Sequence, residues 1–511
     1  MKKLLFLLLP FTTTLVLAQK NDGSAQFADL ITQQALKEKL TIVASAEMEG
    51  RETASPGQKR AAAYIESLFK SYGLKPGNGN SYQQLFPVYQ EFLTEKNLQV
   101  NGKTFTWDKD FTFSLRGLNN TDLTVNDIVF AGYGNVDEAK KINDFAGLDV
   151  KNKIVMILTE PGNNARGGAR AAMMAQFQKM NAVVKMGAAG LLFVSQDFPR
   201  KNPTPLKGGM SLKAPSAASA NSFLMATISS DVASALLGRT APVSFSQLAE
   251  ANKGKYVAEL HVVAKKTAQE LESSNVIGIL PGTDKKDEYV FLTGHYDHLG
   301  KDGDVIYYGA DDDGSGTVSV LQMAEAFSAA AKKGHKPRRS IIFMTVSGEE
   351  KGLLGSEYYS EHPTIDMTKA SADLNTDMVG RVDTERKTGD TLNYVYVIGH
   401  DKLSSDLPVI NEGVNKEYTN LVLDYKYDDP KDQNRIYYRS DHYNFAKKGV
   451  PILFFYDGML QADYHRPTDT VEKINFPLME KRVRMIFHTA WAIANRDDML
   501  KRDIPLNMPG R

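Results

Sequence analysis

The sequence predicts an α/β protein, with a mostly parallel mixed sheet flanked by helices and a second, small α/β domain inserted into the first. Three observations predict this fold. From about residue 272 onward, apolar strand-like segments alternate with helical ones, which is typical of a mainly parallel sheet covered on both faces. Residues 119–271 form a glycine-rich block with short strands of its own. The chain has 511 residues, which is too long for one hydrophobic core.

The expected elements follow in chain order. A helix is expected over 26–45, and a clearer one begins after Pro56 and Gly57, carries apolar residues at helical spacing and stops at Gly73. In the inserted block we expect strands at 128–130, 153–158 and 190–194 and a helix at about 169–186. In the last part we expect strands at 276–280, 289–293, 340–346, 371–376 and 451–455, and helices at 316–333 and 476–495.

The first eighteen residues have the features of a signal peptide. Lys2 and Lys3 precede the apolar run Leu4–Leu9, and Ala18 offers a small residue for cleavage. A membrane anchor is the alternative, but the uninterrupted apolar run is too short to cross a bilayer. We therefore expect export to the periplasm or the medium, with no stable membrane insertion after cleavage. Residues 19–118 and 272–511 would then be the two parts of the larger domain.

Charge and cysteine content limit the functions open to this chain. It has 61 Lys and Arg residues and 61 Asp and Glu residues, so no global field would attract nucleic acid or an anionic membrane. No nucleic-acid partner is expected, and the oligomeric state is left open. The chain has no cysteine, so a metal site must be built from His and carboxylate side chains.

Polar clusters follow the predicted strands of the last part of the chain. They are Gly294–His298 after the strand at 289–293, Glu349 and Glu350 after the strand at 340–346, and Asp377 after the strand at 371–376. Gly309–Gly316, with three consecutive aspartates, precedes a helix, and Tyr464-His465 lies in a late loop. Each cluster alone is compatible with an ordinary solvated turn. Because ligands of open α/β sheets collect at the carboxyl ends of the strands, the clusters together predict one site.

Imidazole and carboxylate ligands together suit zinc. Two zinc ions about 3.5–4 Å apart need a bridging ligand, and a carboxylate can give one oxygen to each ion. Zinc lowers the pKa of bound water to about 7, which supplies hydroxide at neutral pH. An adjacent pair such as Glu349 and Glu350 can then divide the work, with one residue on the metal and the other accepting a proton from the water.

These motifs resemble those of the co-catalytic zinc aminopeptidases of the bacterial leucyl aminopeptidase type, a family that also includes glutamate carboxypeptidase and the glutaminyl cyclases. The pieces that carry the resemblance are Thr293–Asp297, Gly309–Gly316, Ser347–Glu350, Asn375–Gly380, Arg439–His442 and Tyr464-His465. The segment Met48–Arg51 also resembles the start of the family. The block 119–271, with Phe130–Gly134 and Lys185–Gly190, resembles a protease-associated domain. The resemblance implies the zinc exopeptidase fold.

The resemblance also implies a ligand set for two Zn²⁺ ions per chain. Asp312 would bridge the two ions. His295 and Asp377 would complete one zinc site, and Glu350 and His465 would complete the other.

Four more residues receive roles from the resemblance. Glu349 would be the general base and acid that assists attack of the metal-bound hydroxide on the carbonyl. Asp297 would orient a ligand imidazole. Tyr464 would steady the oxyanion, and Arg439 would contact the substrate or the tetrahedral intermediate. The expected function is that of an exported peptidase that hydrolyses peptides or proteins at a chain terminus, most simply an aminopeptidase.

Alternative functions on the same fold are a glutaminyl cyclase-like aminoacyltransferase and a carboxypeptidase. The cyclase branch is expected to keep one zinc and to lose part of the five-ligand set, whereas all five positions here carry competent ligands. Hydrolysis is therefore favoured, and the preference for the amino end follows family tendency alone. A non-catalytic binding protein is a further alternative, and the intact Glu349 argues against it.

Overall fold

The computed structural model describes residues 23–115, 118–137, 140–159, 168–214, 223–429 and 431–507. The segment predicted to be a signal peptide lies outside the described residues. The chain divides into two compact units, one formed by residues up to Leu85 together with those from Ser273 onward, the other by Phe86–Glu272. We refer to them as the larger unit and the inserted unit.

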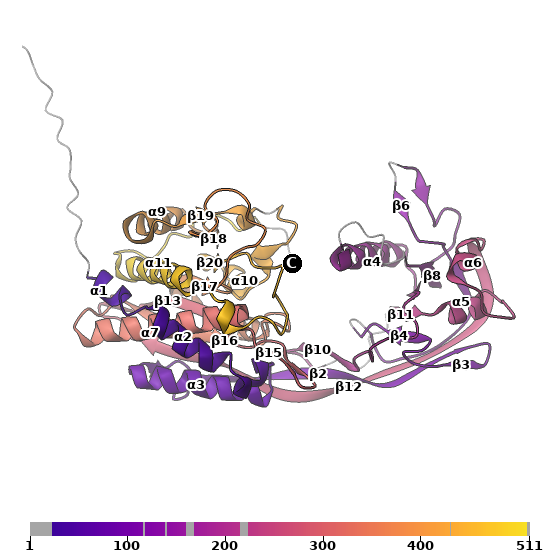
Figure 1. Cartoon of the computed structure of the whole chain (residues 1–511), viewed down its shortest axis with the longest axis horizontal. Coiled ribbons are helices and arrows are strands. Elements are labelled where there is room, and N and C mark those ends of the chain that lie inside the picture. Colours follow the sequence, from indigo (N-terminus) through magenta and orange to yellow (C-terminus); the bar gives the residue numbers. More distant parts are fainter. Residues whose placement is uncertain are drawn as a thin grey trace, which may run out of the picture. The chain divides into compact units, whose positions relative to one another are not determined.

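The larger unit is built on a mixed, mainly parallel sheet flanked by helices, as the sequence predicts (Figure 1). Its strand order is β19 (Val422–Asp424), β18 (Tyr394–Ile398), β20 (Ile452–Tyr456), β17 (Ala370–Thr376), β13 (Lys285–His295), β16 (Arg339–Val346) and the last part of β12 (Gly254–Leu280). β13 is parallel to β16 and β17, and β17 is parallel to β20. β12 and β18 are antiparallel to β16 and β20. The carboxyl ends of the four parallel strands therefore lie at one edge.

Successive residues of the central strand face two different cores, because side chains alternate along a strand. Val290 and Leu292 of β13 pack in one core, and Phe291 packs in the other. The first core is shared with α2 (Gln33–Val43), α3 (Pro56–Tyr72), α7 (Gly316–Lys332) and α11 (Phe476–Asn495). The second is shared with α8 (Leu354–Glu361) and α10 (His442–Ala446). Both faces of the sheet are thus covered.

Helix α3 begins and ends where its local sequence dictates. The Ser55 side chain accepts a hydrogen bond from the backbone N–H of Gln58, and Pro56 occupies the first turn. Gly73 ends the helix with a φ of 83°, a conformation that glycine adopts at little cost. The buried side chains Ala61, Ile65 and Phe69 recur at helical spacing. The prediction for this helix is confirmed.

The inserted unit has its own parallel strands and its own cores. Its strand order is the first part of β12, then β5 (Thr121–Phe130), β8 (Ile154–Leu158), β9 (Gly190–Val194), β11 (Leu224–Ile228) and β4 (Phe111–Phe113). β5, β8, β9 and β11 are parallel. The helices are α4 (Gly168–Lys185), α5 (Ser230–Leu236) and α6 (Phe245–Ala249).

The boundaries of the inserted unit differ from the predicted 119–271. The unit begins at Phe86, because β2 (Gln83–Val100) belongs with it. β2 pairs with β3 (Lys103–Phe105) and β10 (Lys207–Ser211), and its residues Leu93, Leu98 and Val100 enter the same core as Ile128. Its end at Glu272 lies one residue beyond the predicted end.

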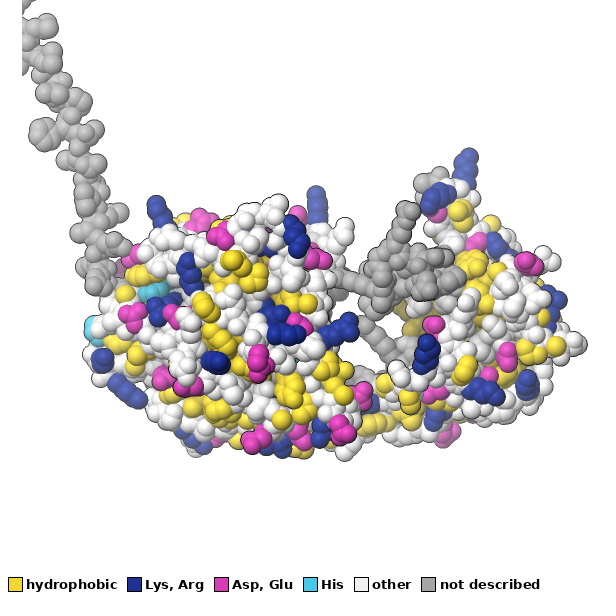
Figure 2. Space-filling view, viewed as in Figure 1, with side chains coloured by type: hydrophobic (Ala, Val, Ile, Leu, Met, Phe, Trp, Pro, Cys, Tyr) yellow, Lys and Arg dark blue, Asp and Glu magenta, His cyan; other side chains and the backbone are white. Residues whose placement is uncertain are grey.

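The remaining α-helices and strands are short. They are α1 (Ala25–Ala28), α9 (Asp406–Val414), β1 (Lys75–Pro76), the pair β6 (Val136–Asp137) and β7 (Ile142–Asn143), and the pair β14 (Gly300–Asp302) and β15 (Val305–Tyr307). Among the helices that the structure describes, none has the length and apolar character needed to cross a membrane. Basic and acidic side chains are interspersed over the visible face of each unit (Figure 2).

Candidate active site

Three parallel strands deliver polar side chains to one edge of the sheet. His295 is the last residue of β13 and lies opposite Val346, the last residue of β16. Glu349 and Glu350 follow in the turn after β16, and Asp377 follows directly after β17. Side chains that are far apart in the chain therefore meet because the strands that carry them are parallel and in register.

The five predicted metal ligands lie close together in the structure. The Nε2 atom of His295 is 3.3 Å from Oδ1 of Asp312 and 3.6 Å from Oδ1 of Asp377. The Nε2 atom of His465 is 3.2 Å from Oδ2 of Asp312 and 3.0 Å from Oε2 of Glu350. Each oxygen of Asp312 thus faces a different imidazole.

The loop that presents Asp312 is fixed by two neighbouring carboxylates. Asp313 accepts hydrogen bonds from the backbone N–H groups of His295, Gly316 and Met378, at 3.1, 2.8 and 3.0 Å. Asp469 accepts hydrogen bonds from the backbone N–H groups of Asp311 and Asp312. These bonds tie the aspartate loop to the ends of β13 and β17 and hold Asp312 between the two imidazoles.

Arg51 also connects the aspartate loop to the end of β13. Its buried guanidinium donates to the carbonyl oxygens of Tyr296 at 2.7 Å and Gly309 at 2.8 Å. It also donates to the carbonyl oxygens of Val43 and Tyr308. Burial lowers the pKa of Arg51 to about 10, and nearby carboxylates such as Asp297 oppose that shift. The side chain remains a cation that holds four carbonyl groups.

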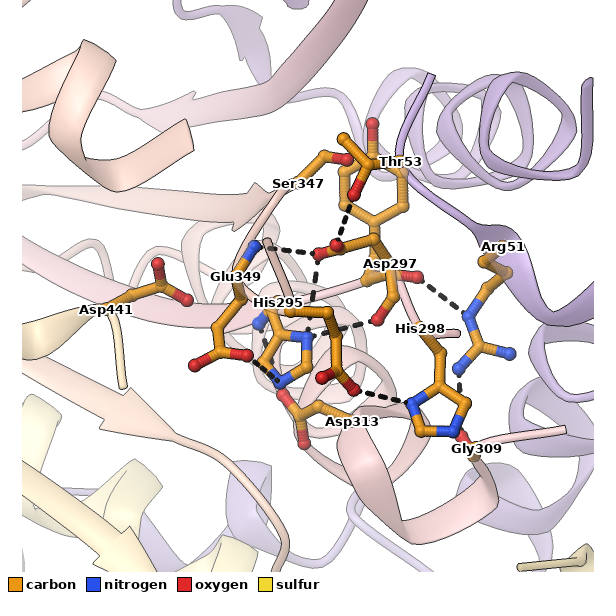
Figure 3. Close-up of polar contacts among 12 residues, drawn as sticks. Arg51, Thr53, His295, Asp297, His298, Gly309, Asp313, Ser347, Glu349 and Asp441 are labelled. Carbon is orange, nitrogen blue, oxygen red and sulfur yellow. Dashed lines mark hydrogen bonds and ion pairs between the residues drawn. The ribbon is translucent and has the colours of Figure 1, made fainter. Parts of the chain in front are cut away.

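Asp297 is predicted to orient a ligand imidazole through its carboxylate, and the structure gives this carboxylate other partners. Its two oxygens accept hydrogen bonds from the backbone N–H of Glu349 at 3.2 Å and from the Thr53 hydroxyl at 2.7 Å. The Nδ1 atom of His295 lies 3.1 Å from the backbone carbonyl oxygen of Asp297 and 3.7 Å from its carboxylate. The carbonyl is therefore the nearer partner of the imidazole. Figure 3 shows Thr53 and Arg51 beside Asp297 and His298.

The electrostatics of the cluster call for positive charge at its centre. Burial would raise the pKa of Asp312, but its contacts with His295 and His465 hold that pKa well below the usual value. Burial would lower the pKa of His465, but Asp312 and Glu350 raise it to about 10. Burial raises the pKa of Glu349 well above its usual value, and the neighbouring carboxylates Glu350 and Asp377 add to the effect. Cations would stabilise this set of carboxylates.

The residues fit a pair of metal ions. Within the cluster, two groups have ligand atoms within 4.8 Å of one another, His295 with Asp312 and Asp377, and His298 with Asp312 and Glu350, so Asp312 belongs to both. Ligands of one tetrahedral zinc lie about 3.4 Å apart, close to the 3.0–3.6 Å separations from His295 and His465. Both Nε2 atoms are buried and lack an aligned hydrogen bond. These nitrogen atoms are therefore available to bind a metal ion.

A pocket of about 320 Å³ opens beside the cluster. Its polar side is formed by Asp312, Glu349, Asp377, Arg439 and Tyr464, and its apolar side by Met378, Ile436, Phe454, Tyr456 and Leu460. Arg439 donates a hydrogen bond to the Tyr464 hydroxyl at 2.9 Å, and the Tyr464 ring stacks on His465 at 3.8 Å between centroids. The two predicted substrate-contact residues therefore line the pocket.

Residues 275–490 match the family model of peptidase family M28. This region is an M28 metallopeptidase domain. The match confirms the resemblance to the co-catalytic zinc aminopeptidases. The M28 region includes every predicted ligand and Glu349.

Curated relatives match part of this chain. A probable leucine aminopeptidase of Trichophyton verrucosum is 27% identical over 226 residues, which cover 43% of this chain and 57% of the relative. A probable glutamate carboxypeptidase of Arabidopsis thaliana is 34% identical over 125 residues, covering 24% of this chain and 17% of the relative. The chain thus spans a little over half of the first of these relatives and a smaller part of the second.

Solved structures match the fold of the chain over nearly its whole length. An aminopeptidase from Aneurinibacillus sp. strain AM-1 has a TM-score of 0.57 at 21% identity, covering 96% of this chain and 100% of the other. A zinc aminopeptidase from Bacillus subtilis has a TM-score of 0.52 at 19% identity, covering 94% and 99%. These likenesses confirm the predicted α/β fold of the M28 domain.

The structure adds residues to the M28 site that the sequence reasoning left without a role. Arg51, Thr53, Asp313 and Asp469 hold the ligands or their loops through hydrogen bonds. His298 lies 2.8 Å from Glu350 and forms a possible metal-holding group with Glu350 and Asp312. A signal existed for three of them, since His298 ends the polar cluster Gly294–His298. Arg51 ends the segment Met48–Arg51, and Asp313 belongs to the run of three aspartates.

Proposed function

We propose that the chain is a zinc-dependent exopeptidase that binds two zinc ions and removes residues from the amino end of peptides. The observation that carries this proposal is the placement of Asp312, whose two carboxylate oxygens face two different imidazoles at 3.3 and 3.2 Å. One carboxylate with an oxygen for each side is the arrangement that a bridged pair of metal ions requires. His295 and Asp377 would complete one site, and Glu350 and His465 the other.

Zinc at this site would polarise the peptide carbonyl and make the attacking water more acidic. Glu349 would accept a proton from that water and then pass it to the leaving amine. The raised pKa of its buried carboxyl suits a group that must hold a proton between these two steps. Its backbone N–H, bound to Asp297, fixes the turn from which the carboxylate reaches the pocket.

Tyr464 and Arg439 would act on the carbonyl side of the scissile bond. The Tyr464 hydroxyl can donate a hydrogen bond to the oxygen that gains negative charge during attack. Arg439 donates to that hydroxyl oxygen at 2.9 Å, which leaves the hydroxyl proton free to point into the pocket. The half-buried guanidinium would also add positive charge beside the developing oxyanion.

The pocket supports an aminopeptidase with a preference for apolar first residues. The carboxylates of Glu349 and Asp377 line the polar side of the pocket, where they would attract the ammonium group of a free amino terminus. Ile436, Phe454 and Leu460 offer an apolar wall for the side chain of that residue. The names of the fungal relatives agree with this choice.

The test uses the purified chain loaded with zinc. We expect close to two zinc ions per chain, hydrolysis of leucine and phenylalanine arylamides, and no hydrolysis of their N-acetylated forms. Glu349→Ala should keep both zinc ions and lose about 100- to 10,000-fold in kcat, the usual contribution of a general base. About one zinc per chain, with glutamine cyclisation and no hydrolysis, would favour the cyclase alternative. Preference for N-blocked peptides with a free carboxyl end would favour the carboxypeptidase.

The proposal also includes export of the chain and a protease-associated inserted unit. Export rests on the sequence of residues 1–18, and cleavage after Ala18 would give a mature chain that starts at Gln19. Mass spectrometry of protein recovered from the periplasm or medium of an expressing bacterium should find this terminus. A mature chain that still starts at Met1 would contradict cleavage. The inserted unit carries none of the proposed zinc ligands, so its role would be to influence which peptides reach the pocket.

A further inference from the structure

A loop at residues 463–469 carries Tyr464 and His465, two of the residues proposed to act at the metal site. We refer to it as the His465 loop. His465 has a φ of 56°, in the left-handed region that residues other than glycine seldom occupy. With this backbone, its Nε2 atom lies 3.2 Å from Asp312 and 3.0 Å from Glu350. Because such a conformation persists only where surrounding contacts impose it, other residues of the loop must hold it.

Asp463, at the start of the His465 loop, accepts hydrogen bonds from three side chains on one buried carboxylate. The guanidinium of Arg381 donates to Oδ2 at 2.8 Å. The Thr468 hydroxyl and the Lys473 ammonium donate to Oδ1 at 2.6 and 2.5 Å. The backbone carbonyl oxygen of Asp463 accepts from the N–H of Arg466 at 2.9 Å. The bonds with Arg466 and Thr468 therefore close the loop around the two functional residues.

Arg381 connects the His465 loop to the segment that carries Asp377, another proposed ligand. Arg381 follows Asp377 by four residues, and its side chain is only 13% exposed. Its backbone carbonyl oxygen accepts a hydrogen bond from Arg482 of α11 at 2.8 Å, so its own position is fixed. Its Nη2 atom binds Asp463, and its Nη1 atom lies 4.0 Å from Oδ1 of Asp469. The guanidinium thus lies between the two ends of the loop.

We infer that Asp463 is a positioning residue for Tyr464 and His465, which it serves by fixing their loop to Arg381. Without this carboxylate, the backbone of His465 would leave the left-handed region, and its imidazole would turn away from the shared ligand Asp312. Residues that orient a ligand in this way are worth about tenfold to a hundredfold in metal affinity or activity. The inference rests on the proposed two-zinc function, in which His465 completes the second site.

The variants Asp463→Ala and Asp463→Asn test it, with Asp406→Ala as a matched control. Asparagine keeps one acceptor oxygen and should retain part of the effect. The Asp406 carboxylate is 12% exposed, against 10% for Asp463, and it too pairs with an arginine and a lysine, Arg496 and Lys501. The carbonyl oxygen of Arg496 accepts from Arg339 at the start of β16, at the edge of the sheet opposite the metal cluster. The control measures the loss of a similar ion pair away from the site.

The first measurement is hydrogen exchange of the zinc-free chain, followed by mass spectrometry of peptides that cover the His465 loop. The backbone N–H groups of Arg466 and Asp469 are hydrogen-bonded within this loop. We expect Asp463→Ala to speed their exchange by about tenfold, the effect of losing roughly one hydrogen bond. Exchange in the rest of the larger unit should stay near the parent rate. Asp406→Ala should leave exchange in the His465 loop unchanged.

The second measurement is zinc affinity, by titration against a fluorescent chelator, together with kinetics at saturating zinc. Asp463→Ala should weaken one of the two zinc ions about tenfold to a hundredfold and leave the other within about threefold. Because Tyr464 moves with the same loop, kcat should stay about tenfold low at saturating zinc, with KM within about threefold of the parent. Asp463→Asn should fall between Asp463→Ala and the parent. Asp406→Ala should lower the melting temperature and leave both zinc affinities and kcat unchanged.

Unchanged exchange in the His465 loop of Asp463→Ala would overturn the inference. So would zinc affinities and a kcat that all stay close to those of the parent. An equal loss of both zinc affinities, or the same losses in Asp406→Ala, would make the role of Asp463 structural and would also overturn it. A parent chain that binds fewer than two zinc ions would instead refute the proposed function, whereas the exchange measurement would still report whether Asp463 holds the loop.

Discussion

Replacing Arg51 with methionine should weaken zinc binding, because Arg51 holds both the segment after β13, at Tyr296, and the start of the aspartate loop, at Gly309. The substitution keeps an apolar stem of similar length and removes the donors to the carbonyl oxygens of Val43, Tyr296, Tyr308 and Gly309. A buried carbonyl that loses its donor costs about 1 kcal/mol at the low end, so four carbonyls cost about 4 kcal/mol. With an unfolding entropy of about 2.1 cal/mol/K per residue, a loss of about 4 kcal/mol in a chain of 511 residues corresponds to a fall in Tm of about 4 °C.

The matched control is Arg339→Met. Arg339 is also a fully buried arginine, and it donates to the carbonyl oxygens of Ile493, Arg496 and Asp497 and to Glu288. It begins β16, at the end of the sheet opposite the metal cluster. Both variants should lose stability in thermal unfolding of the zinc-free chain. Only Arg51→Met should also weaken zinc binding, by tenfold or more for each ion.

The reasoning is refuted if Arg51→Met unfolds within 2 °C of the parent. It is also refuted if the two arginine variants bind zinc equally tightly. The first result would mean that water replaces the guanidinium at all four carbonyls. The second would mean that the end of β13 and the aspartate loop keep their positions without the hydrogen bonds from the Arg51 guanidinium.

Three further changes have definite expected outcomes. Asp312→Ala should lower zinc content to near zero, measured by elemental analysis, because both sites share this carboxylate; a variant that keeps one zinc would contradict the bridge. Tyr464→Phe should lower kcat about 100-fold with little change in KM, measured on leucine arylamide, since one oxyanion donor contributes about 100- to 1,000-fold; an unchanged kcat would remove Tyr464 from the mechanism. Burial raises the pKa of Asp373 to about 8, so the folded state binds the proton of this carboxyl more tightly than the unfolded state does. The free energy of unfolding therefore falls as the pH rises from about 4 to 8, by up to about 1.4 kcal/mol per pH unit. Asp373→Asn should therefore gain stability relative to the parent on going from pH 5 to pH 8.5 in thermal unfolding, and a constant difference between the two proteins would show that Asp373 is ionised in the fold.

An element could be predicted from the sequence where its own residues determine where it begins and ends. Helix α3 begins at the Ser55 cap and ends at Gly73, and both signals are in its own sequence. Strand β12 shows the limit. Only its buried end, 276–280, was predicted, although the strand runs over Gly254–Leu280. The rest alternates between exposed and buried residues and depends on pairing with β5.

The same distinction holds in the site. The predicted ligands stand in compact motifs at the ends of strands, and the structure brings all five together. Thr53 and Asp469 could not be assigned from the sequence, because their roles depend on partners 244 and 158 residues away. A threonine and an aspartate in loops have no local feature that indicates such a partner. The start of the inserted unit was misplaced for the same reason, since β2 joins it through pairing.

The pairing of β2 with β12 has a consequence for how the chain folds. Arg51 and Tyr296 are separated by 245 positions in the chain, and Phe86–Glu272 makes up most of that interval. The entropy lost on closing a flexible loop increases with the logarithm of its length. Once β2 has paired with β12, the two ends of the insertion are joined, and the remaining loop is much shorter. We therefore expect the insertion to fold first, and mutations that weaken it to slow the appearance of peptidase activity during refolding.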